Sequence, residues 1–172
     1  MKFGPLPKDL DLRGLATRGV VIKGTASLEA LPRLKEAGIG MDALAVAEFR
    51  FSRDEELRYV VQTQVEVSLR LTCQRCLEGM QSHLATGSRM ACVWSDAEAA
   101  ALPSSLEPLI VGEMADLNEI LEEEILLAVP VSPGHEEDCW TQNGHLLSEE
   151  AAQKAAEPGA GNPFSVLEKL RN

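Results

Sequence analysis

A strict two-residue alternation runs through residues 61–73, VQTQVEVSLRLTC, and constrains the fold more than any other feature. Valine, leucine, threonine and cysteine occupy one parity, and glutamine, glutamate, serine, arginine and threonine occupy the other. Side chains of a strand point alternately to the two faces of a sheet, so the pattern predicts a strand with one buried and one solvated face. Residues 43–52, joined to it by the polar turn 53–56, are its predicted hairpin partner.

Further elements are predicted on both sides of this hairpin. Residues 18–26 suit a short strand, residues 27–38 a helix shortened or kinked at Pro32, and residues 83–94 a third strand of the hairpin sheet. Apolar residues at 117, 120, 121, 125 and 128 form one stripe of a helix, which Asp116 and Glu119 would begin as a capping box.

These elements predict an α+β fold: a hairpin-rich antiparallel sheet, which could close into a barrel, covered by an acidic amphipathic helix. Residues 1–148 are predicted to form one domain, and residues 149–161 a flexible acidic linker. In residues 162–172, Asn162 suits an N-cap and Pro163 the first helical position, so a short C-terminal docking helix is expected.

The composition predicts a cytoplasmic protein. The longest apolar run, residues 125–131, is far shorter than the roughly 20 residues that span a bilayer. The first residues show no signal-peptide pattern, and four cysteines in 172 residues do not make a disulfide scaffold. We therefore expect reduced thiols and no membrane association.

Acidic residues are concentrated in the second half of the chain. Residues 90–153 hold 14 Asp and Glu and no Lys or Arg, whereas residues 1–89 hold 13 Lys and Arg against 11 Asp and Glu. Such a segment repels phosphates and attracts a basic protein; a solvated face that aids solubility is the alternative. The candidate partner-binding carboxylates are Asp116, Glu119, Glu122, Glu123, Glu124, Glu136, Glu137 and Asp138.

Cys73 and Cys76 form a C-x-x-C pair where the alternating strand ends. Two intervening residues let both sulfurs reach one ion, and His135 with Cys139 would complete a Cys3His zinc site. Two alternatives stay open: the cysteines are small turn or core residues, or they form a redox dithiol. A dithiol needs a helix N-terminus or a basic neighbour, and among the residues nearby Arg75 alone favours it. Zinc is the one candidate cofactor.

Other candidate sites are weaker. Cys92 alternates with Met90 and Trp94 and reads as a core thiol, and no Ser/His/Asp arrangement or phosphate-binding loop is evident, so no catalytic residue is predicted. An RNA-binding face is the alternative to a protein-binding one. Aromatic residues are 4% of the chain, which leaves little for base stacking. The candidate residues of the RNA-binding face are Arg50, Arg53, Arg58, Arg70 and Arg75.

Six blocks, in order, give the chain a resemblance to a known family. They are CQRC at 73–76, LPSSLEPLIV at 102–111, DL at 116–117, EEEILLAVPVSP at 122–133, His135 with Cys139, and NPFSVLEKL at 162–170. Together they cover roughly residues 55–172, and the chain resembles the large ribosomal RNA subunit accumulation protein family (YceD). The resemblance implies a bacterial cytoplasmic, non-enzymatic factor that supports synthesis, processing or stability of 23S ribosomal RNA.

Two hypotheses follow. In the first, the chain is an acidic adaptor for a basic ribosomal protein or a pre-50S particle, and any contact with rRNA is indirect. In the second, it binds RNA directly through the arginine face and a zinc-braced turn. No small-molecule substrate is predicted.

Overall fold

The computed structural model describes residues 3–137 and Cys139. Contacts divide the chain into two compact units, Met1–Gly134 and His135–Asn172. The linker at 149–161 and the helix at 162–172 lie outside the described residues, so the division of the chain into a domain, a linker and a docking helix stays a prediction. None of the helices in the described part is long and apolar enough to cross a membrane.

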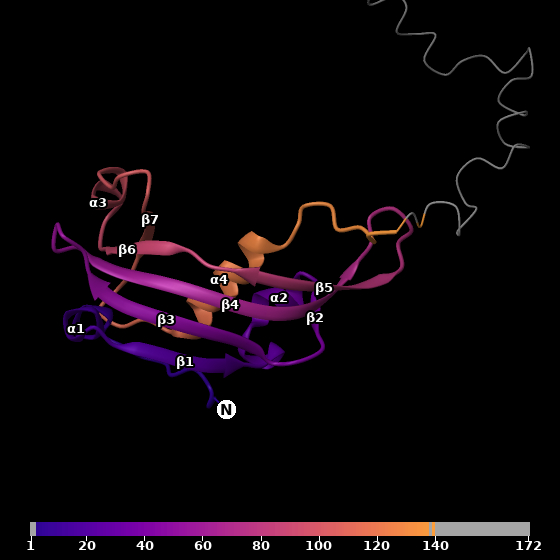
Figure 1. Ribbon diagram of the computed structural model, residues 1–172, viewed down its shortest axis with the longest axis horizontal. Coiled ribbons are helices and arrows are strands. Elements are labelled where there is room, and N and C mark those ends of the chain that lie inside the picture. The colour runs from indigo at the N-terminus through magenta and orange to yellow at the C-terminus, as the bar shows by residue number, and fades with distance from the viewer. Residues whose placement is uncertain (1–2, 138, 140–172) are drawn as a thin grey trace, which may run out of the picture. The chain divides into compact units, whose positions relative to one another are not determined.

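The unit that ends at Gly134 is a mixed α+β structure (Figure 1). Its helices are α1 Leu12–Arg18, the 3-10 turn η1 Leu28–Ala30, α2 Pro32–Glu36, α3 Asp96–Ala100 and α4 Leu117–Ala128. Its strands are β1 Val21–Ala26, β2 Gly40–Met41, β3 Ala45–Arg53, β4 Tyr59–Thr72, β5 Gly79–Thr86, β6 Arg89–Val93 and β7 Glu107–Ile110.

The alternating run is β4, the strand on which the sheet is built. Its inward parity is buried from Val61 to Cys73, and Gln62, Gln64 and Glu66 on the other parity are exposed. β3 pairs with it antiparallel, Arg53 opposite Tyr59 and Val46 opposite Glu66. The predicted hairpin is therefore confirmed.

The predicted helix at 27–38 is broken, as the proline suggests. η1 ends at Ala30, and α2 begins at Pro32, which occupies the first helical turn. A proline lacks the N–H that a continuous helix requires, but it is well tolerated at a first helical position.

The sheet does not close, so a barrel-like closure is wrong. The strand order is β1-β3-β4-β6-β7, with β2 and β5 also paired to β4. β7 runs parallel to β6, and the chain then enters α4. α4 packs over the buried face of the sheet instead of adding a strand that would join β7 to β1 (Figure 1).

Residues 83–94, predicted as one strand, belong to two. β5 pairs with residues 65–72 of β4, and β6 pairs with residues 60–62 of the same strand. The chain changes from one to the other at Gly87, where a Cβ atom would lie 2.5 Å from the carbonyl oxygen of Thr63. Since no side chain fits that close approach, the glycine permits the break.

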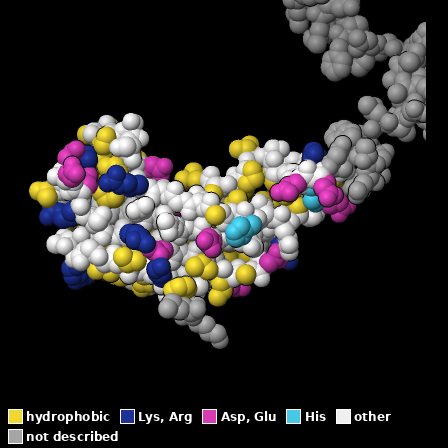
Figure 2. All heavy atoms as spheres, in the orientation of Figure 1, with side chains coloured by type: hydrophobic (Ala, Val, Ile, Leu, Met, Phe, Trp, Pro, Cys, Tyr) yellow, Lys and Arg dark blue, Asp and Glu magenta, His cyan; other side chains and the backbone are white. Residues whose placement is uncertain are grey.

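The main core lies between the inner face of the sheet and α4. Leu117, Leu121 and Ile125 are fully buried, and they belong to the same cluster as Phe49 and Val61 of β3 and β4. A second, small cluster of Val60, Ala91 and Leu106 lies at the start of β4 on the opposite face. No other element among the described residues covers the remainder of that opposite face, which we call the open face (Figures 1 and 2).

α4 begins at Asp116, but not through the predicted capping box. The Asp116 carboxylate accepts the backbone N–H of Asn118 at 2.8 Å and its side-chain N–H at 2.7 Å. Burial raises the pKa of this carboxyl, but the bonds from Asn118 and Lys8 outweigh that effect and hold the pKa below its usual value. The carboxylate therefore stays ionised and satisfies orphan donors of the first turn.

Candidate functional site

The CQRC turn after β4 is a tight hydrogen-bonded loop. The N–H of Leu77 donates to the carbonyl of Cys73 at 2.9 Å, and the N–H of Cys73 donates to the carbonyl of Glu78 at 2.9 Å. Leu77 has a φ of 62°, a left-handed conformation that turns the chain back into β5. The backbone N–H of Arg75 points at the Cys73 sulfur at 3.4 Å, a contact that would stabilise negative charge on that sulfur.

The segment that follows α4 meets this turn before the first unit ends. The N–H of Gln74 donates to the carbonyl of Pro133 at 2.8 Å, and a Cβ on Gly134 would lie 3.2 Å from the Arg75 guanidinium. His135 is the next residue, so the path of the first unit alone carries the chain to the two cysteines.

The four predicted metal ligands form one group. Cys73, Cys76, His135 and Cys139 each offer one ligand atom, and these atoms lie within 4.8 Å of one another. Around tetrahedral zinc, with Zn–S bonds near 2.3 Å, neighbouring ligand atoms are about 3.8 Å apart. The donor set suits zinc chemically, and its spacing requires a contraction of about 1 Å or less.

Cys92 stands apart from this group as a core thiol, as predicted. It is 4% exposed, and burial raises the pKa of its thiol to about 11. A thiol-specific reagent at pH 8 should therefore leave Cys92 unmodified in the folded protein, since about one thiol in a thousand is ionised. Counting reactive thiols before and after adding guanidinium checks this. If the folded parent shows one more reactive thiol than Cys92→Ala before guanidinium is added, the prediction is wrong.

The glutamates of α4 do not form the solvated face that the sequence suggests. Glu122 and Glu124 are 3% and 6% exposed, so that interpretation is wrong for both. One Glu122 oxygen accepts the backbone N–H of Leu34 at 3.1 Å, which satisfies a donor at the start of α2. A partner protein cannot reach either carboxylate without moving α4.

Glu124 is held by two hydroxyls of the sheet. Ser88 donates to one carboxylate oxygen at 2.6 Å, and Thr63 donates to the other at 3.1 Å. The Thr63 hydroxyl in turn accepts the backbone N–H of Ser88 at 2.9 Å. Each hydroxyl proton thus has an acceptor on the carboxylate, so this buried polar group is hydrogen-bonded although no cation pairs with it in the described part of the chain.

Other candidate carboxylates are accessible. Glu119, Glu123, Glu136 and Glu137 are exposed, and Glu123 forms an ion pair with Arg33. Asp116 is half-buried and pairs with Lys8 at 3.3 Å. Asp138 lies outside the described residues.

The candidate RNA-binding arginines are mostly occupied by partners of their own chain. Arg50 pairs with Glu48 at 2.6 Å and Arg70 with Asp42 at 3.1 Å. In the hairpin turn, Arg53 donates twice to the carbonyl of Leu57. Arg75 also has interactions of its own. These contacts compete with phosphate for the guanidinium groups.

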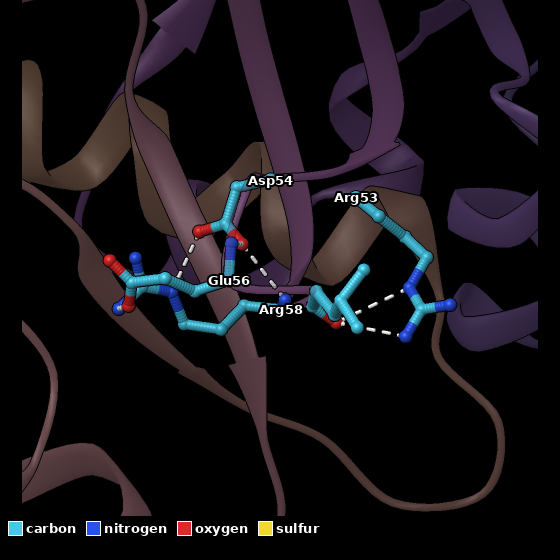
Figure 3. Close-up of polar contacts among 5 residues, drawn as sticks. Arg53, Asp54, Glu56 and Arg58 are labelled. Atoms are coloured by element: carbon cyan, nitrogen blue, oxygen red, sulfur yellow. Dashed lines mark hydrogen bonds and ion pairs between the residues drawn. The ribbon is translucent and has the colours of Figure 1, made fainter.

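Arg58 is held by two carboxylates of the β3–β4 turn (Figure 3). Its side chain binds Asp54 and Glu56 at 2.7 Å each, and Asp54 also accepts the backbone N–H groups of Glu56 and Arg58. Burial raises the pKa of the Asp54 carboxyl, but the bonds from Arg58 and Glu56 more than offset it, so the pKa lies below its usual value.

The Asp54→Asn variant should lose about 1 kcal/mol of stability at neutral pH. Because the folded-state pKa is depressed, the contribution is complete above the unfolded pKa of about 3.9 and is lost as the pH falls through the folded value. Urea midpoints of parent and variant should therefore converge towards pH 2. Glu55→Gln, at the exposed neighbour, is the control, and a difference that is constant with pH would rule out the ionic origin.

One basic residue of the open face, Arg89, is not among the five arginines predicted from the sequence. Arg89 lies opposite Gln62, which in turn lies opposite Arg50, so the three form a row across β6, β4 and β3. Arg89 is exposed, and no hydrogen bond or ion pair involves it among the residues that the structure describes. Its place depends on the break between β5 and β6, which the sequence pattern did not reveal.

Comparisons with known proteins agree on one family. The family described as "Large ribosomal RNA subunit accumulation protein YceD" matches residues 61–171. A protein named "Large ribosomal RNA subunit accumulation protein YceD" from Haemophilus influenzae (strain ATCC 51907 / DSM 11121 / KW20 / Rd) is 29% identical over 173 residues, which cover 96% of each chain. No solved structure matches this chain. The family match includes β4 from residue 61 onward, the CQRC turn and α4.

Proposed function

Since this chain belongs to the large ribosomal RNA subunit accumulation protein YceD family, we propose that it is a non-enzymatic cytoplasmic factor for large-subunit rRNA. It supports synthesis, processing or stability of 23S rRNA as an acidic adaptor that holds a basic ribosomal protein, free or within a pre-50S particle. The observation that carries the adaptor role is the distribution of charge: 14 Asp and Glu and no Lys or Arg in residues 90–153. A surface of this sign attracts basic proteins and repels rRNA phosphates.

The partner would meet the accessible carboxylates. On α4 these are Glu119 and Glu123, with Asp116 at the helix start, and beyond α4 they are Glu136 and Glu137. Glu122 and Glu124 support the surface from inside instead. The binding surface is therefore smaller and more defined than the glutamate count suggests.

A serine–histidine contact on the sheet does not argue for catalysis. Ser68 Oγ and His83 Nδ1 lie 3.4 Å apart, opposite each other on β4 and β5. Strand register alone accounts for this contact, and the pair lies on the solvent side of the sheet.

The adaptor role is tested by affinity recovery from cells with and without nuclease. Recovery of basic ribosomal proteins should survive nuclease and should fall for the double variant Glu119→Lys/Glu123→Lys. Glu55→Lys/Glu66→Lys, which makes the same charge change on exposed residues elsewhere, is the matched control. If nuclease abolishes all recovery of ribosomal proteins, the adaptor role is wrong.

Zinc is the proposed cofactor, held by Cys73, Cys76, His135 and Cys139. In such a site the metal supplies a structural brace and no chemistry. Native mass spectrometry of protein purified without chelator should find about one zinc per chain. Cys73→Ser should abolish it and Cys92→Ala should retain it. A metal-free parent, or equal loss in both variants, would show that no such site exists.

Direct RNA binding is the second candidate, favoured by the row Arg50–Gln62–Arg89 and by a zinc-braced CQRC turn. The row places two guanidinium groups on the open face, where they can contact successive phosphates. Filter binding to 23S fragments over a salt series tests it, with Arg50→Gln/Arg89→Gln as the variant. No affinity at low salt removes this candidate.

A further inference from the structure

A groove runs beside α4, bounded by the start of α2 and by the connection from β7 to α4. Its volume is about 530 Å³. Its lining includes the apolar side chains of Ile110, Met114 and Ile120 and the charged side chains of Glu119 and Arg33. It lies on the acidic part of the chain and includes Asp116, Glu119 and Glu123 of the proposed partner-binding surface.

Two large apolar side chains of the groove are exposed to solvent. Ile110 is 56% exposed and Met114 52%, and they are four residues apart on one connection. Adjacent large apolar side chains, rimmed by charges, are typical of an interaction surface, whereas single exposed apolar residues are ordinary.

The rim selects the charge of an occupant. The accessible carboxylates of the lining are Asp116, Glu119 and Glu123, against two cations, Lys8 and Arg33; Glu122 also lines the groove but is buried and bonded to Leu34. Glu123 is in an exposed ion pair with Arg33, which an incoming cation can replace at little cost, whereas Asp116 is half-buried and pairs with Lys8. Glu119 has no hydrogen bond or ion pair within the described part of the chain, so it is available to a basic side chain.

The adjoining strand favours an extended occupant. β7 is the last strand of the sheet, and the N–H of Val111, the residue after it, donates to the carbonyl of Val93 at 3.0 Å. In a parallel ladder alternate residues bond to alternate sides, so the backbone N–H and carbonyl of Ile110 face away from β6. Pro108, at the same edge, has no N–H, and this keeps the available edge short.

We propose that this groove binds an extended segment of a basic protein in which lysine or arginine alternates with apolar residues. The apolar side chains cover Ile110 and Met114, the cations contact Glu119 and Glu123, and the backbone pairs with Ile110. The inference rests on the proposed function, because it names the surface on which the adaptor holds its basic partner.

Fluorescence anisotropy tests the groove with a defined probe. The probe is a fluorescein-labelled peptide of about twelve residues in which lysine and arginine alternate with valine and serine, a length that spans the β7 edge in an extended form. Binding to the full chain should weaken with salt, and a peptide with glutamate at each cation should not bind. Absence of binding at low salt overturns the proposal.

Variants decide where the peptide binds. Glu119→Lys and Ile110→Ser/Met114→Ser should each weaken binding about tenfold or more. The matched controls, Glu66→Lys on the open face and Leu44→Ser, a 54% exposed leucine, should bind as the parent does. All these positions are exposed, and thermal melts confirm that each variant is folded. If Glu66→Lys weakens binding as much as Glu119→Lys, the attraction is non-specific and the groove is not the site.

The two proposals fail separately. Recovery of ribosomal proteins from nuclease-treated cells by Ile110→Ser/Met114→Ser at the parent's level would keep the adaptor and overturn the groove. Peptide binding that depends on Glu119, without recovery of any ribosomal protein by the parent, would keep the groove and overturn the adaptor.

Discussion

Alanine in place of Leu121 is expected to lower the free energy of unfolding by about 3 kcal/mol. Leu121 is fully buried in the middle of α4, between the helix and the inner face of the sheet. The substitution removes the free energy gained by burying the lost methyl and methylene groups. It also leaves a cavity that the rigid β-strands cannot fill. Urea denaturation followed by circular dichroism measures the change.

Leu127 on the same helix is the control. It is 73% exposed, so Leu127→Ala should change the stability by about 0.5 kcal/mol or less. Equal losses in the two variants would mean that α4 does not pack on the sheet through the face that contains Leu121.

A similar loss, again about 3 kcal/mol, is expected for Glu124→Ala. The substitution removes the acceptor of two hydroxyl groups, Thr63 and Ser88, in a buried site. Each hydroxyl left without an acceptor costs about 1–3 kcal/mol. Glu124→Gln should lie between the parent and the alanine variant, because its amide oxygen accepts one hydroxyl while its NH2 group faces the other.

Glu123, the neighbouring glutamate, separates burial from charge. Its side chain is exposed and its ion pair with Arg33 lies at the surface, so Glu123→Ala should cost about 1 kcal/mol or less. If the two alanine variants are equally stable, Glu124 contributes through helix propensity or net charge and not through its bonds to the sheet.

The elements predictable from sequence are those set by local periodicity. The β3–β4 hairpin follows from alternation and a short polar turn, and α4 follows from its apolar stripe. The division of residues 83–94 into two strands was not predictable in this way. β6 is buried at every residue from Met90 to Val93, because a cluster covers each of its faces, and a strand buried on both faces shows no alternation.

The burial of Glu124 could be predicted from its spacing along α4. Glu124 is seven residues after Leu117 and three after Leu121, which places it on the apolar stripe. Thr63 is the polar residue of the inward parity of β4 before Cys73. A polar residue on each of two apolar surfaces suggests that they meet, but the partner Ser88 could not be foreseen, because it depends on the turn at Gly87.

The candidate ligands were predictable as residue types, whereas their neighbourhood was not. The C-x-x-C spacing singles out Cys73 and Cys76, but the path that carries Pro133 and Gly134 to them is a long-range contact. For the arginines, the prediction overestimated how available the side chains are. Their outward parity suggested available cations, and carboxylates of the same chain, such as Asp42 and Asp54, hold them instead.

β4 hydrogen-bonds to β2, β3, β5 and β6, and this restricts where the chain can change in length. A one-residue insertion or deletion between Tyr59 and Thr72 moves every later side chain of the strand to the other face, and it does so against several neighbours at once. Such a change cannot be absorbed by re-pairing a single hairpin. Insertions are therefore expected to be tolerated in the connections at 54–58 and 94–106, whereas the length of β4 itself should be fixed.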